Sequence, residues 1–248
     1  NRSLFKDGFN MQDVSGVRVM MLKVNHTEAS PLHDKNVRSA VAHIINYDTM
    51  AKVIGGGALA GGAPFPPSAS LGYDGLSNKE VTDLVKANEL LTQAGYVKNG
   101  NGIYAKDGKE LKLTLAIWGK DTSMYEEIQQ ELKQAGIAVE LRKLQSPNEV
   151  DTLGVDSFDL VERNVVTMST NDPYWFLSLF YKSGSKANVG GYNNPQVDTL
   201  IDKLAVTFDQ NERTNVAKQV QSILLDDVAD IYLLYPAANV VSTSKVKN

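Results

Sequence analysis

The stretch from residue 111 to residue 141 constrains the fold of this chain more than any other. Large aliphatic residues alternate with other residues over 111–117, which is the period of a strand with one buried face. An apolar stripe at helical spacing follows over 124–135, Gly136 ends it, and a second alternating run covers 137–141. A strand, a helix and a strand in about thirty residues form a βαβ unit with parallel strands and a right-handed crossover. The sequence therefore predicts an α/β protein.

Further strands and helices surround this unit. Residues 55–68 contain five glycines and three prolines, so we expect a long loop without regular structure there. No linker divides the chain, and one α/β lobe is expected. Strands are predicted over 17–24, 158–163, 231–235 and 239–242. Helices are predicted to begin at or just after Asp34, Tyr47, the capping boxes of 77–80 and 123–126, Asp172, Asn194 and residue 211.

Composition excludes several classes of protein. The 248 residues include 25 basic and 29 acidic side chains, and the net charge of −4 argues against a generally basic nucleic-acid binder. The absence of cysteine removes disulfides, thiolate nucleophiles and thiolate metal sites. No apolar run approaches the roughly 18 residues that a membrane span requires. The chain begins at Asn1 without a signal peptide, which indicates a processed product or an excised piece.

Motifs for catalysis are weak. The spacing of His26, His33 and His43 matches no metal-binding pair, so solvent-facing or helix-capping histidines are expected. No GxSxG nucleophile motif is present. The glycine-rich loop at 55–68 follows a helix and lacks the Lys-Ser/Thr pair of a phosphate-binding loop, which favours an ordinary surface loop.

The segment that begins at Arg163 is the best candidate for ligand binding. Strand ends in α/β sheets open onto ligand crevices. The residues after Arg163 are uncharged as far as Asp172. An aspartate in the position of Asp172 is more often a helix cap than a ligand contact. Such a loop can offer hydroxyls, amides and backbone N–H groups to an anion, but a solvated arginine before an ordinary connection fits equally well. Trp175 is either a stacking residue or part of the core. The candidate ligand-binding residues are Arg163, Asn164, Thr167, Met168, Ser169, Thr170, Asn171 and Trp175.

Three segments, in order along the chain, resemble one protein family. Residues 31–48 contain PLHDKNVRSA and INYD, residues 87–115 contain ANELL, AGY and GKELKLTL, and residues 172–201 contain DP, FL and GYNNPQVDTLI. These segments are similar to those of the bacterial family 5 extracellular solute-binding proteins, which are peptide and nickel receptors of ABC importers. Together with the stretches around them, they cover nearly the whole chain.

The resemblance implies both a fold and a function. Residues 1–248 would form a single ligand-binding lobe of a larger two-lobed protein, without the first lobe and the terminal return segments. The fold would be one lobe of the periplasmic-binding-protein-like, type II or Venus-flytrap kind, with a mixed sheet flanked by helices. The protein would capture a small peptide or a nickel or other metal chelate and deliver it to an ABC permease.

Further expectations follow from the same resemblance. The chain would not be an enzyme, would be a monomer, and would need no cofactor, because any metal would arrive inside a chelate. It would bind no nucleic acid and insert no segment into a membrane. The intact lipoprotein would lie at the extracellular face of the cell membrane, anchored by lipid through the missing N-terminus, or in the periplasm.

Individual residues match the family only in part. Peptide-binding members have an aspartate where Ser169 stands, and a serine cannot neutralise a peptide α-ammonium group. Arg163 matches an arginine found in some oligopeptide members, whereas Ser185 stands where one nickel-binding type has a histidine. Residues 65–68 resemble the nickel type slightly more. Two alternatives are an α/β enzyme that uses the glycine-rich loop or Asp172, and a sensor or chaperone of the same fold that does not transport.

Overall fold

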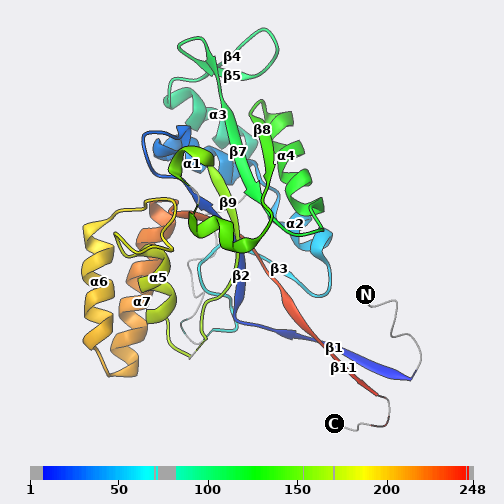
Figure 1. The fold of residues 1–248 in the computed structure, drawn as a ribbon, viewed down its shortest axis with the longest axis vertical. Helices are drawn as coiled ribbons and strands as arrows, with labels where there is room; N and C mark the ends of the chain where they lie inside the picture. Colours follow the sequence, from blue (N-terminus) through cyan, green and yellow to red (C-terminus); the bar gives the residue numbers. More distant parts are fainter. Residues whose placement is uncertain are drawn as a thin grey trace.

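A six-stranded mixed sheet forms the centre of the molecule, in a computed structural model that describes residues 8–69, 71, 82–152, 154–169, 171–243 and 245. Parallel pairing joins β7 to β8 and to β9, while the other pairs are antiparallel. The predicted βαβ unit and mixed sheet are therefore confirmed (Figure 1). The strands lie in the order β3 (Leu59–Ala60), β10 (Asp230–Tyr235), β2 (Arg18–Val24), β9 (Leu160–Val166), β7 (Lys112–Ile117) and β8 (Ala138–Lys143).

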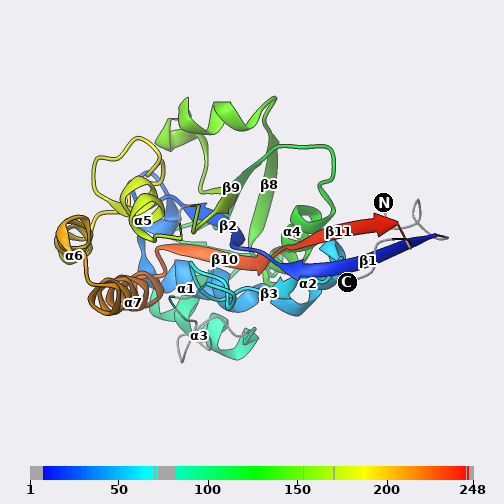
Figure 2. The same ribbon diagram turned by 90° about the horizontal axis from the view of Figure 1, so that it is seen from below.

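Helices cover both faces of this sheet and bury a separate core on each (Figure 2). Along β2, Leu22 belongs to the first core, whereas Val19 and Met21 belong to the second, as expected for side chains that alternate between faces. The first core is covered by α1 (Lys35–Ile44), α2 (Tyr47–Ile54), α3 (Leu84–Gln93) and α4 (Ser123–Ala135), and the second by α5 (Tyr174–Tyr181), α6 (Pro195–Val206) and α7 (Gln210–Asp226).

Two smaller β structures extend from the body. The first is an antiparallel sheet of β4 (Val97–Lys98), β5 (Tyr104–Lys106) and β6 (Lys109–Glu110). The second is an antiparallel ribbon of β1 (Phe9–Ser15) and β11 (Ala237–Thr243), which projects away from the sheet (Figures 1 and 2). Short 3-10 helices, η2 (Pro31–His33), η3 (Pro147–Thr152) and η4 (Val155–Ser157), lie in the connections.

Several local expectations need correction. The strand predicted over 158–163 is β9, which runs from Leu160 to Val166, so Arg163 lies in its middle rather than at its end. The capping box at 123–126 is wrong, because the N-cap is Thr122, whose Oγ1 donates to Glu126 Oε1 at 2.6 Å. The capping box at 77–80 lies outside the described residues. Asp34 caps α1 as predicted, accepting from the Asn36 backbone N–H at 2.8 Å.

The glycine-rich segment is not irregular throughout. Leu59 and Ala60 form β3, which pairs with β10. The next residue, Gly61, passes so close to β10 that a Cβ atom would lie 2.0 Å from the carbonyl oxygen of Tyr232. Glycine is thus required here by a close approach of two backbones.

None of the described helices combines the length and the apolar character that a membrane crossing requires.

Candidate ligand-binding site

The carboxyl ends of β7, β8 and β9 lie at one edge of the sheet, because these three strands are parallel. The segments that follow them are 118–122, 144–159 and 167–173, and we call these three segments the carboxyl edge. β2 is antiparallel to β9, with Arg18 opposite Val166, so the first residue of β2 also lies at this edge. Ligands of α/β proteins bind in such positions, where loops rather than strands define the surface.

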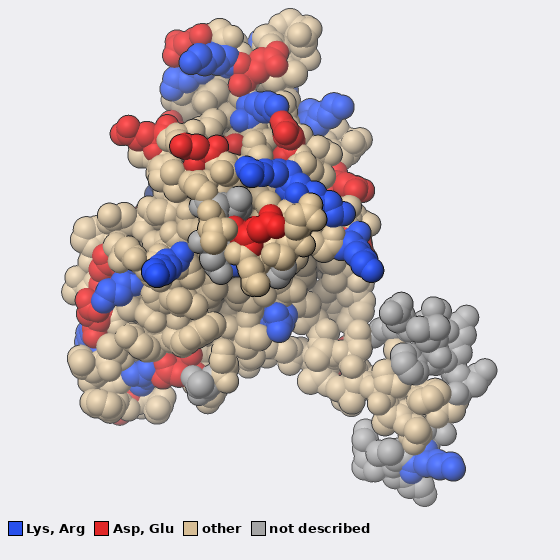
Figure 3. Space-filling model, in the orientation of Figure 1, with Lys and Arg blue, Asp and Glu red and all other residues tan. Residues whose placement is uncertain are grey.

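Charged side chains are unevenly distributed over the face of the molecule that Figure 3 shows. Lysine, arginine, aspartate and glutamate intermingle over the upper half of the molecule, around α3, α4 and β8 (Figure 3). The surface in the lower centre, between α5 and the ribbon of β1 and β11, is mostly uncharged, and the outline there is concave. The three segments of the carboxyl edge themselves contain one lysine and six acidic residues, so their own charge is mostly negative.

Arg163 and Asn164 point to opposite faces of β9. Arg163 lies opposite Met21, on the face that α5 covers, and is 9% exposed. Its charge helps to lower the pKa of the Lys23 ammonium group, although burial of Lys23 is the largest cause of that shift. Asn164 is exposed on the other face, where its backbone oxygen and its Oδ1 both accept from Arg18 Nη1 at 3.2 Å.

Thr167 and Met168 anchor the loop that follows β9. The backbone N–H and the Oγ1 hydroxyl of Thr167 both donate to the carbonyl of Val17, at 2.8 and 3.0 Å. Thr167 is fully buried, and Met168 packs into the second core. These contacts hold the start of the loop against β2.

The next residues turn outward. Ser169 and Asn171 are exposed, while Thr170 lies outside the described residues. Asn171 adopts a φ of 55°, and its N–H donates to the Met168 carbonyl at 3.1 Å, which closes a turn. Asparagine tolerates this left-handed conformation better than most residues. The polar groups of Ser169 and Asn171 are thus available at the surface.

Asp172 and Trp175 have different roles. Asp172 Oδ1 accepts from the Tyr174 N–H at 2.7 Å, and its Oδ2 forms an ion pair with Arg213 of α7. The N-cap residue of α5 is the next one, Pro173, so Asp172 lies one position before the cap. Trp175 is 47% exposed, and its ring meets the ring of Phe180 edge to face at a centroid distance of 6.3 Å. The neighbouring Phe176 is fully buried, so Trp175 presents its ring to the surface.

Three further residues lie at or near the carboxyl edge: Trp118, which the sequence alone offers as a candidate for stacking, and Glu162 and Arg18, which the sequence analysis missed. Trp118 directly follows β7, and its backbone N–H donates to Glu162 Oε1 at 2.9 Å. Glu162 is 4% exposed, and burial raises the pKa of its carboxyl group, against the opposing effect of hydrogen bonds from Tyr125 and Trp118. The third residue, Arg18, could have been suspected only from the pairing of β2 with β9, which no local pattern reveals.

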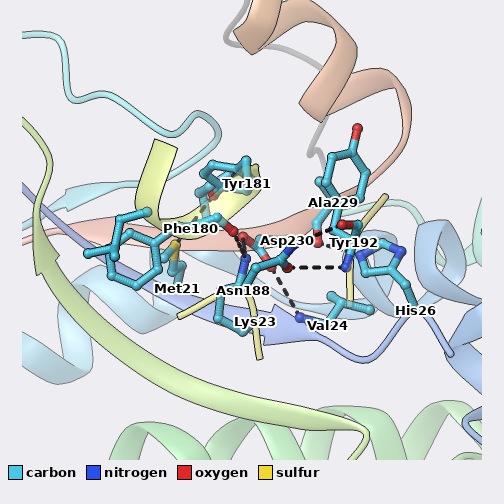
Figure 4. A network of polar contacts seen from close by, with 12 residues as sticks. Met21, Lys23, Val24, His26, Phe180, Tyr181, Asn188, Tyr192, Ala229 and Asp230 are labelled. Atoms are coloured by element: carbon cyan, nitrogen blue, oxygen red, sulfur yellow. Dashed lines mark hydrogen bonds and ion pairs between the residues drawn. The ribbon is translucent and has the colours of Figure 1, made fainter. Parts of the chain in front are cut away.

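A buried network attaches α5 to the sheet near the far end of β2 (Figure 4). Lys23 Nζ donates to Asp230 Oδ2 at 2.8 Å and to the Phe180 carbonyl at 3.2 Å, and it lies 4.4 Å from the centre of the Tyr181 ring. Asp230 Oδ1 accepts from the Val24 N–H at 3.1 Å. Lys23 and Asp230 are 1% and 0% exposed, so this pair is closed to ligands and has a structural role.

His26 and His33 lie elsewhere, around a cavity of about 400 Å3 at the far end of β2, and His43 lies in the last turn of α1. His26 is more buried than predicted, and its Nε2–H donates to the Ala229 carbonyl at 2.8 Å. Burial, with the nearby Arg38 charge, lowers the pKa of His26 from 6.5 to about 3. His33 Nδ1 donates to the His26 carbonyl at 2.7 Å. Within the described ranges, no three histidine, aspartate or glutamate side chains gather as metal ligands would.

Comparison with known proteins identifies the family. The sequence profile described as "Bacterial extracellular solute-binding proteins, family 5 Middle" matches residues 4–188, which is well over half of the chain. The chain belongs to this family. Its members are extracellular binding proteins, as the resemblance in the three segments implied.

Relatives agree over nearly the full chain. The nickel-binding protein NikA of Staphylococcus aureus is 28% identical over 239 residues, covering 94% of this chain and 46% of the relative. The probable D,D-dipeptide-binding periplasmic protein DdpA of Escherichia coli is 27% identical over 246 residues, covering 96% and 45%. The chain thus spans about half the length of these curated relatives.

Solved structures of this family confirm the fold class. The crystal structure of NikA from Staphylococcus aureus in complex with Ni(L-His)2 superposes with a TM-score of 0.80 at 26% identity, covering 98% of this chain and 50% of the other. A nickel ABC transporter structure from Bacillus halodurans gives a TM-score of 0.84 at 25% identity, covering 98% and 51%. The α/β lobe with a mixed sheet is therefore a family 5 lobe.

Ser185 of this family 5 lobe is engaged in the connection behind α5. It is half-buried, and its Oγ donates to the Leu179 carbonyl at 2.5 Å. The position that the resemblance associates with a nickel-type histidine thus holds a hydroxyl with a local structural partner. A metal ligand at this position would have to replace that hydrogen bond.

Proposed function

We propose that this chain is the ligand-binding lobe of a two-lobed receptor of an ABC importer. The observation that carries the proposal is the loop after β9, in a chain of the solute-binding family. Its polar residues Ser169 and Asn171 are exposed, and it leads into α5, where the ring of Trp175 is exposed too. Function follows from capture and release, with no bond made or broken. The second lobe would close over the carboxyl edge by a hinge motion, and we place the connection to it at the ribbon of β1 and β11.

The proposed site divides into contact residues and supporting residues. Ser169, Thr170, Asn171 and Trp175 would meet the ligand directly, together with the exposed amide of Asn164. Thr167 and Met168 would act from beneath by holding the loop, because their side chains are buried. Arg163 would contribute positive charge from within the sheet.

The proposed ligand is a small peptide or a metal chelate that carries carboxylate groups. One relative is named as a nickel-binding protein and another as a probable D,D-dipeptide-binding protein, and these names correspond to the two ligand classes. A metal would enter as part of its chelate, and the protein would need no cofactor of its own. The receptor would be a monomer that binds no nucleic acid, lies outside the cell membrane or in the periplasm, carries a lipid anchor where it is membrane-bound, and passes its ligand to a permease.

The direct test is native mass spectrometry of the full-length receptor, purified without refolding. A co-purified small molecule that is lost on denaturation, with the mass of a peptide or of a metal chelate, supports the proposal. A receptor that carries no such molecule, and that binds neither trialanine nor Ni(II) with L-histidine by calorimetry, contradicts it. Turnover of either probe into a product contradicts the binding role in favour of an enzyme.

A serine-to-aspartate change tests which ligand class the site prefers. Ser169 is exposed, so Ser169→Asp places a carboxylate at the surface without disturbing the core. We expect the variant to bind trialanine about tenfold more tightly, because the new charge pairs with the α-ammonium group, and to bind an anionic chelate more weakly. Calorimetry with N-acetyl-trialanine is the control, because that peptide has no ammonium group and should gain nothing.

A further inference from the structure

Arg18 is a charged residue outside the predicted site that the fold brings to the carboxyl edge. β2 runs antiparallel to β9, and Arg18 lies opposite Val166, the last residue before the candidate loop. Its neighbour Val17 accepts both hydrogen bonds from Thr167. Arg18 and the loop are therefore parts of one connected structure, although 145 residues or more separate them along the chain.

The guanidinium group of Arg18 is held at one end only. Nη1 donates to the backbone oxygen and to the Oδ1 of Asn164, both at 3.2 Å, and the side chain is exposed. In the part of the chain that the structure describes, Nε and Nη2 have no hydrogen-bond partner, and no carboxylate lies within ion-pair distance. A guanidinium carries five N–H donors in a planar fork. Asn164 thus orients the fork while leaving most of it unused.

We propose that Arg18 receives a carboxylate of the ligand and that Asn164 positions it. A guanidinium matches a carboxylate in two parallel hydrogen bonds, and a side chain already held by Asn164 loses less conformational freedom on binding. The inference rests on the proposed function and adds an anion-binding residue to it.

Two sources could supply that carboxylate: the C-terminus of a peptide, or an amino acid that chelates a metal. Four probes separate them in calorimetry with the full-length receptor. These are trialanine, trialanine amide, Ni(II) with L-histidine, and Ni(II) with L-histidinamide. Each amide lacks the carboxylate and keeps the remaining groups of its partner.

For the probe that the wild-type receptor binds, we expect Arg18→Gln to weaken affinity about tenfold to a hundredfold while affecting the matching amide less than about twofold. Arg18→Lys should recover part of the loss, since it keeps the charge without the fork. Asn164→Asp should weaken binding as well, because its carboxylate would occupy Arg18 in place of the ligand. The control is Lys112→Gln, which removes an exposed positive charge, paired with Glu140, at the opposite end of the parallel strands.

The outcomes separate this inference from the proposed function. If the wild-type receptor binds a probe and Arg18→Gln binds it equally well, or loses the acid and the amide equally, the role of Arg18 is overturned and the proposed function stands. If the wild-type receptor binds none of the four probes, the proposed function fails, and this inference fails with it. Melting temperatures of the variants within about two degrees of wild type exclude misfolding as the cause of a loss, as expected at an exposed position.

Discussion

At the scale of single residues, burial decides what each candidate side chain can do. Thr167 has a polar side chain and is nevertheless fully buried, because its hydroxyl donates a hydrogen bond to the Val17 carbonyl. Arg163 was predicted to lie at the end of a strand, but it lies in the middle of β9, near Lys23. Ser169 and Asn171 do reach the surface. The composition of the loop indicated a binding region, but the pairing of β9 with β2 decided which of its residues are exposed and which are buried.

His26 gives a prediction on pH at this scale. Its pKa in the folded protein is about 3, below the ordinary value of 6.5. Between these two pH values the imidazole is protonated in the unfolded chain and neutral in the folded chain. This group therefore costs stability as pH falls from about 6.5 toward 3, by about 2 kcal/mol between pH 7.5 and pH 5. Urea unfolding of wild type and His26→Gln at both values measures it. An equal loss in both proteins would contradict the assignment.

At the scale of elements, the glycine-rich segment acts as a structural connector. Gly61 packs against β10, the Tyr235 hydroxyl donates to the Ala63 carbonyl at 2.9 Å, and Phe65 meets Phe176 of α5 edge to face at 5.4 Å. Ser68 Oγ donates to the Gly16 carbonyl at 2.6 Å, where the ribbon joins β2. A segment whose composition suggested an irregular loop thus joins α5, β10 and the base of the ribbon.

Gly61→Ala should be strongly destabilising at this scale. The new Cβ would meet backbone atoms at 2.0 and 2.5 Å, and backbone cannot yield as a flexible side chain does. We expect a loss of about 3 kcal/mol or more in the free energy of unfolding, measured by urea denaturation. Gly100→Ala is the matched control, because that glycine also lacks a positive φ and has open space around it. A similar cost at both positions would show that the close approach is not what requires glycine.

At the scale of the whole molecule, the site that we propose lies at the carboxyl edge of the sheet. The carboxyl ends of β7, β8 and β9, the beginning of β2 and the base of α5 meet there, beside a ribbon that leads away from the body. The chain covers about half of its curated relatives, so in our proposal the other half supplies the opposing wall.

The full-length receptor should therefore respond to its ligand as one unit. We expect small-angle X-ray scattering to show a smaller radius of gyration with ligand than without, because hinge closure brings two lobes together. At a ligand concentration about 100 times the Kd, binding should add about 2.7 kcal/mol to the free energy of unfolding and raise the melting temperature. An unchanged radius at saturation would contradict closure, even where the stabilisation is observed.

The sequence by itself determined the α/β class, the βαβ unit, most helix boundaries and the family, because these depend on local periodicity, capping residues and short motifs. Asp34 and Gly136 mark helix ends through interactions within a few residues of themselves. Only the tertiary structure decided that Arg18 adjoins Asn164, that Thr167 is buried and that Gly61 must be glycine. Each of these depends on which strand lies beside which, and residues from 17 to 235 must come together before any of the three contacts exists.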